Sequence, residues 1–326
     1  MKDVKAEILV VGSTNIDTII RVSHLPAPGE TVGNATYTTA YGGKGANQAI
    51  ATARSGGEVT FATNLGEDSY TYNLIPYFEE NSINTDYIFL EKKYQTGVAF
   101  IFVADNGENC IAVAPGANGV FKDKKLDQIL DKIGRYKVLL LQLEIPYQSV
   151  TELIKYAKQA GVKVVLNPAP ARPIESEILS QIDILILNET EAEIISGIKY
   201  ADSTPEIIAE SLFKKGPGIV ILTMGAKGAY IYTETIRKYI KAHSVKSVDT
   251  TAAGDTFCGA FIAHLMDTDN IIDAVNYATA AAAISVTKLG AQPSIPKKEE
   301  VMEFLNSQCE LKEELINYQT INKSSL

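Results

Sequence analysis

Short apolar runs alternate with amphipathic stretches along most of this chain. The apolar runs are continuous, which is typical of strands that are buried on both faces of a sheet. Continuous strands that alternate with helices predict an α/β fold, with a doubly wound, mostly parallel sheet flanked by helices. The strands are expected at residues 8–11, 59–63, 138–143, 162–166, 182–187, 219–223, 228–232 and 236–242. The helices are expected at residues 46–55, 69–81, 149–160, 174–180, 189–196, 205–215, 254–266, 271–286 and 297–306.

Two β-rich stretches, at about residues 13–42 and 86–113, interrupt this alternation. The Asp-Asn-Gly sequence at 105–107 is typical of a hairpin turn. One interpretation is a set of extra edge strands. We favour a small β-sheet that acts as a lid, because a lid excludes water from transfer chemistry. Its strands are expected at residues 18–22, 30–41, 87–90, 97–103 and 109–113.

Composition narrows the class of protein. The chain has 326 residues, 46% of them hydrophobic, which is enough for a sizeable buried core. Its net charge is −9 and no Lys/Arg-rich stripe occurs, so a nucleic-acid partner is not expected. The longest apolar run, residues 278–286, is about half of what a membrane helix needs, and the three scattered cysteines form no disulfide framework. We expect a cytoplasmic protein without membrane association, with one domain over residues 1–308 and a C-terminal tail over residues 309–326.

The strongest candidate for chemistry is the run Asp-Thr-Thr-Ala-Ala-Gly-Asp-Thr-Phe at residues 249–257. The small residues Ala252, Ala253 and Gly254 directly precede an apolar-periodic helix. Backbone N–H groups at a helix N-terminus are unpaired and favour an anion, and small side chains let the anion approach. Asp255 beside them could accept the proton of an attacking hydroxyl, as phosphoryl transfer requires. The alternative is that Asp255 only caps the helix.

A second glycine-rich entry to a helix runs from Gly42 to Gln48. It is not a Walker A loop, because Lys44 is followed by Gly45 and the glycine spacing differs. It also lacks the glycine spacing and the later acid of a dinucleotide site. Taken alone, it indicates a tight strand-to-helix turn.

Polar residues follow several predicted strands, at the edge of an α/β sheet where ligands bind. Asn15 and Asp17 come after the first strand and face the same side of an extended chain, which suits the adjacent hydroxyls of a sugar. Glu191 could help to hold hydrated Mg²⁺, which prefers carboxylates. Turns and helix caps are the alternative for each of these positions.

Together and in this order, these motifs resemble the ribokinase group of the PfkB carbohydrate kinases, from about residue 8 to about residue 305. The two signatures are residues 41–49 and 249–259. Five further shared stretches are residues 28–31, 141–144, 167–171, 188–192 and 290–294.

The resemblance implies that the enzyme transfers the γ-phosphoryl group of ATP to the 5-hydroxyl of ribose. Asp255 would be the base, and Ala252, Ala253 and Gly254 the anion hole. The implied sugar ligands are Asn15, Asp17, Gly43, Lys44, Asn47, Glu144 and Asp255. The implied nucleotide residues are Asn188, Glu191, Thr223, Gly225, Ala226, Lys227, Gly228, Gly254 and Thr279, the last at a position where histidine often contacts adenine.

The resemblance also implies two cations and a quaternary state. Glu191 would help to place Mg²⁺. A monovalent cation, usually K⁺, would sit beside the anion hole, and a homodimer would form through the lid strands. The implied K⁺ positions are Asp249, Thr251, Ser285, Lys288, Gly290 and Ser294.

Three alternatives stay open at this point. The first is another substrate within the family, such as 2-deoxyribose, fructose or a nucleoside, although Asn15 favours ribose. The second is a sugar- or nucleotide-binding regulator without catalysis. The third, a nucleotide-dependent oxidoreductase, lacks the dinucleotide fingerprint.

Overall fold

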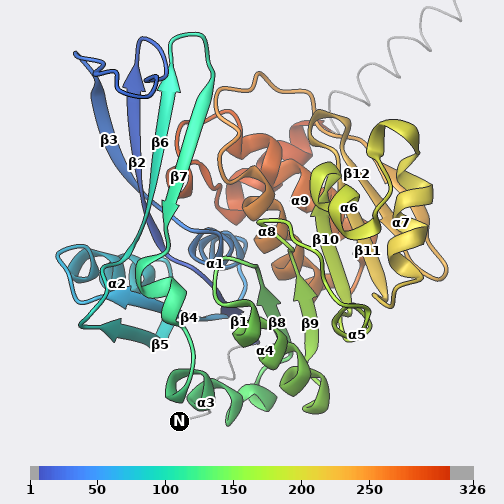
Figure 1. Cartoon of the computed structure of the whole chain (residues 1–326). Coiled ribbons are helices and arrows are strands. Elements are labelled where there is room, and N and C mark those ends of the chain that lie inside the picture. The colour runs from blue at the N-terminus through green and yellow to red at the C-terminus, as the bar shows by residue number, and fades with distance from the viewer. Residues whose placement is uncertain (1–6, 309–326) are drawn as a thin grey trace, which may run out of the picture.

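The computed structural model describes residues 7–308, and two β-sheets organise it (Figure 1). The large sheet has nine strands in the order β13-β12-β11-β10-β9-β8-β1-β4-β5. Neighbouring strands from β5 to β11 are parallel, and β12 and β13 extend the sheet in antiparallel fashion. The strands are β1 (Ile8–Val11), β4 (Val59–Gly66), β5 (Ile83–Glu91), β8 (Val138–Leu141), β9 (Lys163–Leu166), β10 (Ile184–Asn188), β11 (Ile219–Thr223), β12 (Ala229–Tyr232) and β13 (Arg237–Ile240).

Helices cover both faces of this sheet, as the alternating pattern predicts. Ile8 and Val10 point into one apolar core, and Leu9 and Val11 point into the other. The first core is covered by α1 (Lys44–Arg54), α2 (Thr71–Glu80), α8 (Ala253–Thr268) and α9 (Ile271–Ser285). The second is covered by α3 (Lys124–Leu130), α4 (Tyr147–Gln159), α5 (Ser176–Leu179), α6 (Glu189–Ser196) and α7 (Pro205–Phe213). The chain is also helical from residue 298 to residue 308, and the predicted tail lies outside the described residues.

The small sheet stands beside this body, at the upper left of Figure 1. Its order is β3-β2-β6-β7; β2 and β6 are parallel, and the outer pairs are antiparallel. The Asp-Asn-Gly turn joins β6 to β7, as predicted. The strands are β2 (Asn15–Val22), β3 (Thr36–Gly42), β6 (Gly97–Ala104) and β7 (Asn109–Ala114).

Two expectations about the small sheet need correction. The strand expected near residue 87 is β5, which pairs with β4 at the edge of the large sheet, so the second β-rich stretch divides between two sheets. Tyr87 is buried in the core of the large sheet, and this burial decides the pairing. The strand expected from residue 30 begins only at residue 36. We also did not predict α3, because only one and a half turns of apolar spacing mark it.

The strand order places a switch point in the middle of the large sheet. From β1 the chain proceeds to β4 and β5 on one side, and from β8 it proceeds outward to β13 on the other. Crevices at such switch points, outside the carboxyl ends of the strands, are where α/β sheets bind ligands. Among residues 7–308, no helix has both the length and the apolar character needed to cross a membrane.

Candidate active site

A cavity of about 230 Å³ lies at the carboxyl ends of the central strands. Residues from the two glycine-rich helix entries and from the ends of β9, β10 and β11 meet there. Parallel strands bring residues that are distant in sequence to one edge. The lining residues are Lys44, Asn167, Ala169, Ile186, Leu187, Asn188, Glu191, Thr223, Thr250, Ala252, Ala253, Gly254, Asp255 and Cys258.

Asp255 lies in the first turn of α8, and α1 holds both of its carboxylate oxygens. Asn47 Nδ2 donates to Oδ2 at 2.9 Å, and Gln48 Nε2 donates to Oδ1 at 2.9 Å. The two helices pack closely enough that a Cβ on Gly259 would lie 2.5 Å from the Gln48 carbonyl oxygen. The orientation of Asp255 therefore depends on the contact between α1 and α8.

The charge state of Asp255 follows from this environment. Burial raises the pKa of Asp255 above its usual value, although the Lys44 ammonium and the amides of Asn47 and Gln48 lower it in part. A carboxylate with a raised pKa is a stronger proton acceptor than an ordinary one. Asp255 is therefore suited to act as a base toward a hydroxyl that enters the cavity.

The loop before α8 has the features of an anion cradle. Ala252 adopts a left-handed conformation with φ 59°, and the helix has no side-chain cap. Such a conformation is costly for a residue with a Cβ and often marks functional sites. The Ala253 N–H donates to Thr250 O at 3.2 Å, so this one of the three predicted donors already has a partner.

The other glycine-rich entry links α1 to the end of β8. Gly43 has φ 88°, and a Cβ there would lie 2.7 Å from the Asn15 backbone nitrogen, so only glycine lets α1 begin this close to β2. Glu144 Oε2 accepts from the Lys44 N–H at 3.0 Å and from Ser13 Oγ at 2.5 Å. The entry that we described as a tight turn therefore also carries polar groups into the site.

Asn15 and Asp17 lie on the same side of the start of β2, and the Asp17 carboxylate is close to those of Glu144 and Asp255. The Asn15 side-chain oxygen accepts from Asn118 Nδ2 at 2.9 Å. Burial, followed by the nearby Glu144 and Asp255 carboxylates, raises the pKa of Asp17 to about 7. Burial lowers the pKa of Lys44, but the negative charges around it, chiefly the Asp255, Glu144 and Glu191 carboxylates, together raise it by more, so its ammonium stays charged among them.

Asn188 and Glu191 form a capping box at the start of α6. Glu191 accepts from the Asn188 N–H and Nδ2, each at 2.9 Å, and its own N–H donates to Asn188 Oδ1 at 2.9 Å. The capping interpretation is thus confirmed for this pair, yet both side chains also line the cavity. Burial raises the pKa of Glu191.

Comparisons with known proteins agree with this geometry. The sequence matches the pfkB family carbohydrate kinase over residues 5–298. Ribokinase from Haemophilus influenzae is 45% identical over 297 residues, 91% of this chain and 97% of that protein. Deoxyribokinase from Salmonella typhi is 36% identical over 303 residues, 92% of this chain and 99% of that protein. The structure of Arabidopsis thaliana ribokinase complexed with ribose and ATP matches with a TM-score of 0.84 at 32% identity, covering 92% of this chain and 98% of that one.

This chain belongs to the pfkB family of carbohydrate kinases. The membership confirms the predicted family, the fold and the enzyme class, an ATP-dependent sugar kinase. The oxidoreductase alternative is thereby excluded.

Some of the residues that are predicted to bind the nucleotide in this kinase do not line the cavity. Gly225–Lys227 form a 3₁₀ turn after β11, and the flanking Met224 N–H donates to Gly228 O at 2.7 Å. Thr279 is buried in α9, where its hydroxyl donates to Val275 O at 2.7 Å. Four predicted nucleotide residues do line the cavity, namely Asn188, Glu191, Thr223 and Gly254.

Two of the other predicted K⁺ positions of the kinase, Thr251 and Gly290, bond to Asp249. Its Oδ1 accepts from the Thr251 N–H at 2.9 Å and Oγ1 at 2.6 Å, and its Oδ2 accepts from the Gly290 N–H at 2.9 Å. Burial raises the pKa of Asp249, but these hydrogen bonds, together with the charge of Arg21, lower it by more. Ser285 and Ser294 bond to neighbouring carbonyls, and the Lys288 ammonium pairs with Glu300 on the surface.

Asp249 is the one acidic residue among the predicted K⁺ positions. Within residues 7–308, no group of three or more His, Cys, Asp or Glu could hold a metal ion. The resemblance implies that backbone carbonyls, together with Asp249, would be the K⁺ ligands at these positions.

Sequence reasoning missed several polar groups that organise the site. Gln48 donates to Asp255 and to Asn167 Oδ1 at 3.0 Å, and Gln142 Nε2 donates to Gln48 Oε1 at 2.6 Å. Asn167 could have been found, because it directly follows a buried strand as Asn188 does. Asn118 carries no such signal, since it lies in a short 3₁₀ turn at residues 116–120.

Proposed function

We propose that this kinase transfers the γ-phosphoryl group of ATP to O5 of D-ribose. The observation that carries the proposal is the position of Asp255. It stands between the anion-cradle loop and a group of sugar-binding side chains, with both carboxylate oxygens held by α1. This placement suits an acceptor hydroxyl and a phosphoryl group that meet in line beside one base.

In the proposed reaction, Asn15, Asp17 and Glu144 accept hydrogen bonds from ribose hydroxyls, while Lys44 and Asn47 donate to them. Further contact comes from the backbone at Gly43. Asp255 takes the proton of the 5-hydroxyl as O5 forms a bond to the γ-phosphorus, and the bond between that phosphorus and the β,γ-bridging oxygen of ATP breaks. The free N–H groups of the loop at residues 252–254 then stabilise the negative charge on the transferring phosphoryl group.

ATP and its cations would occupy the other end of the cavity. Asn188, Thr223 and the turn at residues 225–228 would bind the nucleotide, with Thr279 close to the adenine end. Glu191 would bind Mg²⁺ through a water molecule, because both of its carboxylate oxygens accept hydrogen bonds from Asn188. K⁺ beside Asp249 would hold the loop in position. We place the reaction in the cytoplasm, where ATP is available.

The substrate proposal is tested by measuring ADP release with D-ribose, 2-deoxy-D-ribose and D-fructose, each with and without K⁺. We expect D-ribose to have the highest kcat/KM, because Asn15 and Asp17 lose hydroxyl partners with a deoxy sugar. Higher activity with another sugar would overturn the substrate but not the mechanism. ATP binding without turnover of any sugar would favour the regulator alternative.

We propose that the small sheet covers the sugar site as a lid and also joins two copies of the chain. The register places Val113, Ala99 and Asp17 side by side on one face of the sheet. On that face Ile111 and Val113 are 56% and 54% exposed. Exposed apolar side chains on an edge strand indicate a surface that a partner covers.

Ile111→Glu is expected to convert the homodimer to monomer in analytical ultracentrifugation at micromolar concentration, because a charge would be buried at the contact. Tyr37→Glu is the matched control, since Tyr37 pairs with Ile20 and is exposed on the opposite face. A wild-type protein that is already monomeric would refute the dimer.

A further inference from the structure

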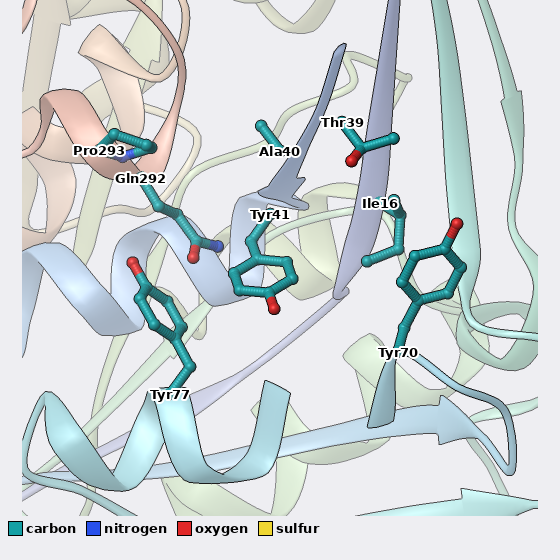
Figure 2. Close-up of a pocket in the computed structure, with 8 residues that line it drawn as sticks. All are labelled: Ile16, Thr39, Ala40, Tyr41, Tyr70, Tyr77, Gln292 and Pro293. Carbon is teal, nitrogen blue, oxygen red and sulfur yellow. The ribbon is translucent and has the colours of Figure 1, made fainter. Parts of the chain in front are cut away.

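A second cavity, of about 360 Å³, shares no lining residue with the active-site cavity. It lies where the base of the small sheet meets α2 and the 3₁₀ turn η5 (Gln292–Ser294). Figure 2 shows its walls, which come from these three parts of the chain. The lining residues are Ile16, Thr39, Ala40, Tyr41, Tyr70, Tyr77, Gln292 and Pro293.

This cavity lies behind the sugar-binding side of the small sheet. Ile16 pairs with Tyr41, and both point to the face opposite to that of Asn15 and Asp17, because side chains alternate along a strand. The two cavities are therefore separated by the strands β2 and β3.

The side chain of Gln292 is the unusual feature of the cavity. It is 0% exposed, and neither its Nε2 nor its Oε1 has a hydrogen-bond partner among the described residues. Figure 2 shows this amide pointing between the rings of Tyr41 and Tyr77. A buried, unsatisfied amide destabilises a fold and needs an explanation. Gln292 belongs to the shared stretch 290–294, yet the proposed reaction makes no use of its side chain.

Apart from Gln292, the described residues that line the cavity are three tyrosines and four smaller uncharged residues. The rings of Tyr41 and Tyr77 have centroids 5.0 Å apart and are tilted by 54°, and Tyr70 stands at the rim (Figure 2). Arg54 lies behind this wall, where its Nη1 donates to Gln292 O and to Ile295 O, both at 2.8 Å. Within residues 7–308, no charged side chain lines the cavity itself.

We propose that this cavity binds an uncharged planar nitrogen heterocycle of the nucleobase type. A primary amide presents a donor and an acceptor side by side, which matches the donor and acceptor edge of a nucleobase. Tyrosine rings provide contact area for a flat ring, and the volume suits a small ligand. A sugar fits less well, because none of the described residues that line the cavity has a carboxylate to accept hydrogen bonds from its hydroxyl groups.

A ligand in this cavity would contact two segments that also carry residues of the proposed active site. Ile16 lies between Asn15 and Asp17 on β2, and Gln292 lies two residues from Gly290, which donates to Asp249. Binding is therefore expected to change the KM for ribose, a consequence that rests on the proposed function, whereas binding itself does not.

The test is isothermal titration calorimetry with adenine, with uracil and with D-ribose. The active site is first saturated with a non-hydrolysable ATP analogue, Mg²⁺ and D-ribose, so that only the second cavity is available. We expect at least one of the two bases to bind. Gln292→Leu and Tyr70→Ala should each weaken binding tenfold or more. Tyr72→Ala, which changes a nearby exposed tyrosine in α2 that does not line the cavity, should leave binding unchanged.

The Gln292→Leu protein should also melt at the same temperature as the wild type or higher, because it removes an unsatisfied buried amide. This result would show that lost binding is not lost folding. Absence of binding by both bases, or binding that neither substitution weakens, would overturn the proposal. Further binding of D-ribose in place of the bases would overturn the ligand class.

Discussion

Asp255→Asn is expected to lower kcat with D-ribose by about 10²–10⁴-fold, the contribution typical of a positioned general base. The substitution keeps the size of the side chain but removes the ability to take the 5-hydroxyl proton. The amide nitrogen also faces one of the two donors, Asn47 Nδ2 or Gln48 Nε2, which it cannot satisfy. Steady-state kinetics at saturating ATP, with the KM for ribose measured alongside, checks this result.

The matched control is Asp273→Asn, because Asp273 also lies in the first turn of a helix, α9, but is exposed and bonds only locally to Asn270. We expect its kcat to stay within about twofold of the wild type, as for a surface substitution. If Asp255→Asn retained a tenth or more of the wild-type kcat, Asp255 would not be the base, and its role would be to join α8 to α1.

Asp17→Asn is expected to act on the KM for ribose, with an increase of about 10²-fold and a much smaller change in kcat. Asp17 is proposed to accept hydrogen bonds from ribose hydroxyls in the ground state and in the transition state alike, and loss of such uniform binding raises KM. Hydrogen bonds to a charged group contribute about 1.5–3 kcal/mol, which corresponds to roughly 10- to 150-fold. A kcat defect as large as that of Asp255→Asn, with an unchanged KM, would contradict this role.

The same residue predicts a pH dependence. Because burial and the carboxylates of Glu144 and Asp255 raise the pKa of Asp17 to about 7, Asp17 takes up a proton as the pH falls below 7. The protonated form accepts fewer hydrogen bonds, so the KM for ribose should rise toward tenfold per pH unit below about 7. Protonation of Asp255 lowers kcat in the same direction. The Asp17→Asn variant should therefore lose the rise in KM and keep the fall in kcat.

A fall in pH should have the opposite effect on the unliganded protein: protonation of Asp17 weakens ribose binding but stabilises the fold. The pKa of Asp17 is about 7 in the folded state against a usual value of 3.8, so the folded state binds the proton more tightly. The stability that this proton contributes is present at low pH and is lost as the pH rises through about 7. Asp17→Asn should then melt at a higher temperature than the wild type at pH 8, which would separate weak binding from poor folding.

Local patterns predicted the elements of the large sheet well. The strand at residues 8–11 and the helix at residues 189–196 have the predicted bounds, because continuous apolar runs and a capping sequence are set by neighbouring residues. Asp255 and the loop before it could also be predicted from the sequence, because small residues before a periodic helix indicate a helix N-terminus that is open to a ligand. Polar residues after buried strands predicted which edge of the sheet would hold the site.

Tertiary structure alone decided which distant segments meet. The spacing of hydrophobic residues in β5 is the same for an edge strand of the large sheet as for a strand of the small one. Its membership of the large sheet follows from its pairing with β4 and from the burial of Tyr87 in the core of that sheet. The parallel pairing of β2 with β6, the bond from Gln48 to Asp255 and the enclosure of Gln292 likewise join residues far apart in the sequence. The sequence determined strands, helices and the open helix end because these depend on nearby residues. Sheet membership, the partners of the base and the second cavity depend on packing between distant segments, which local spacing does not encode.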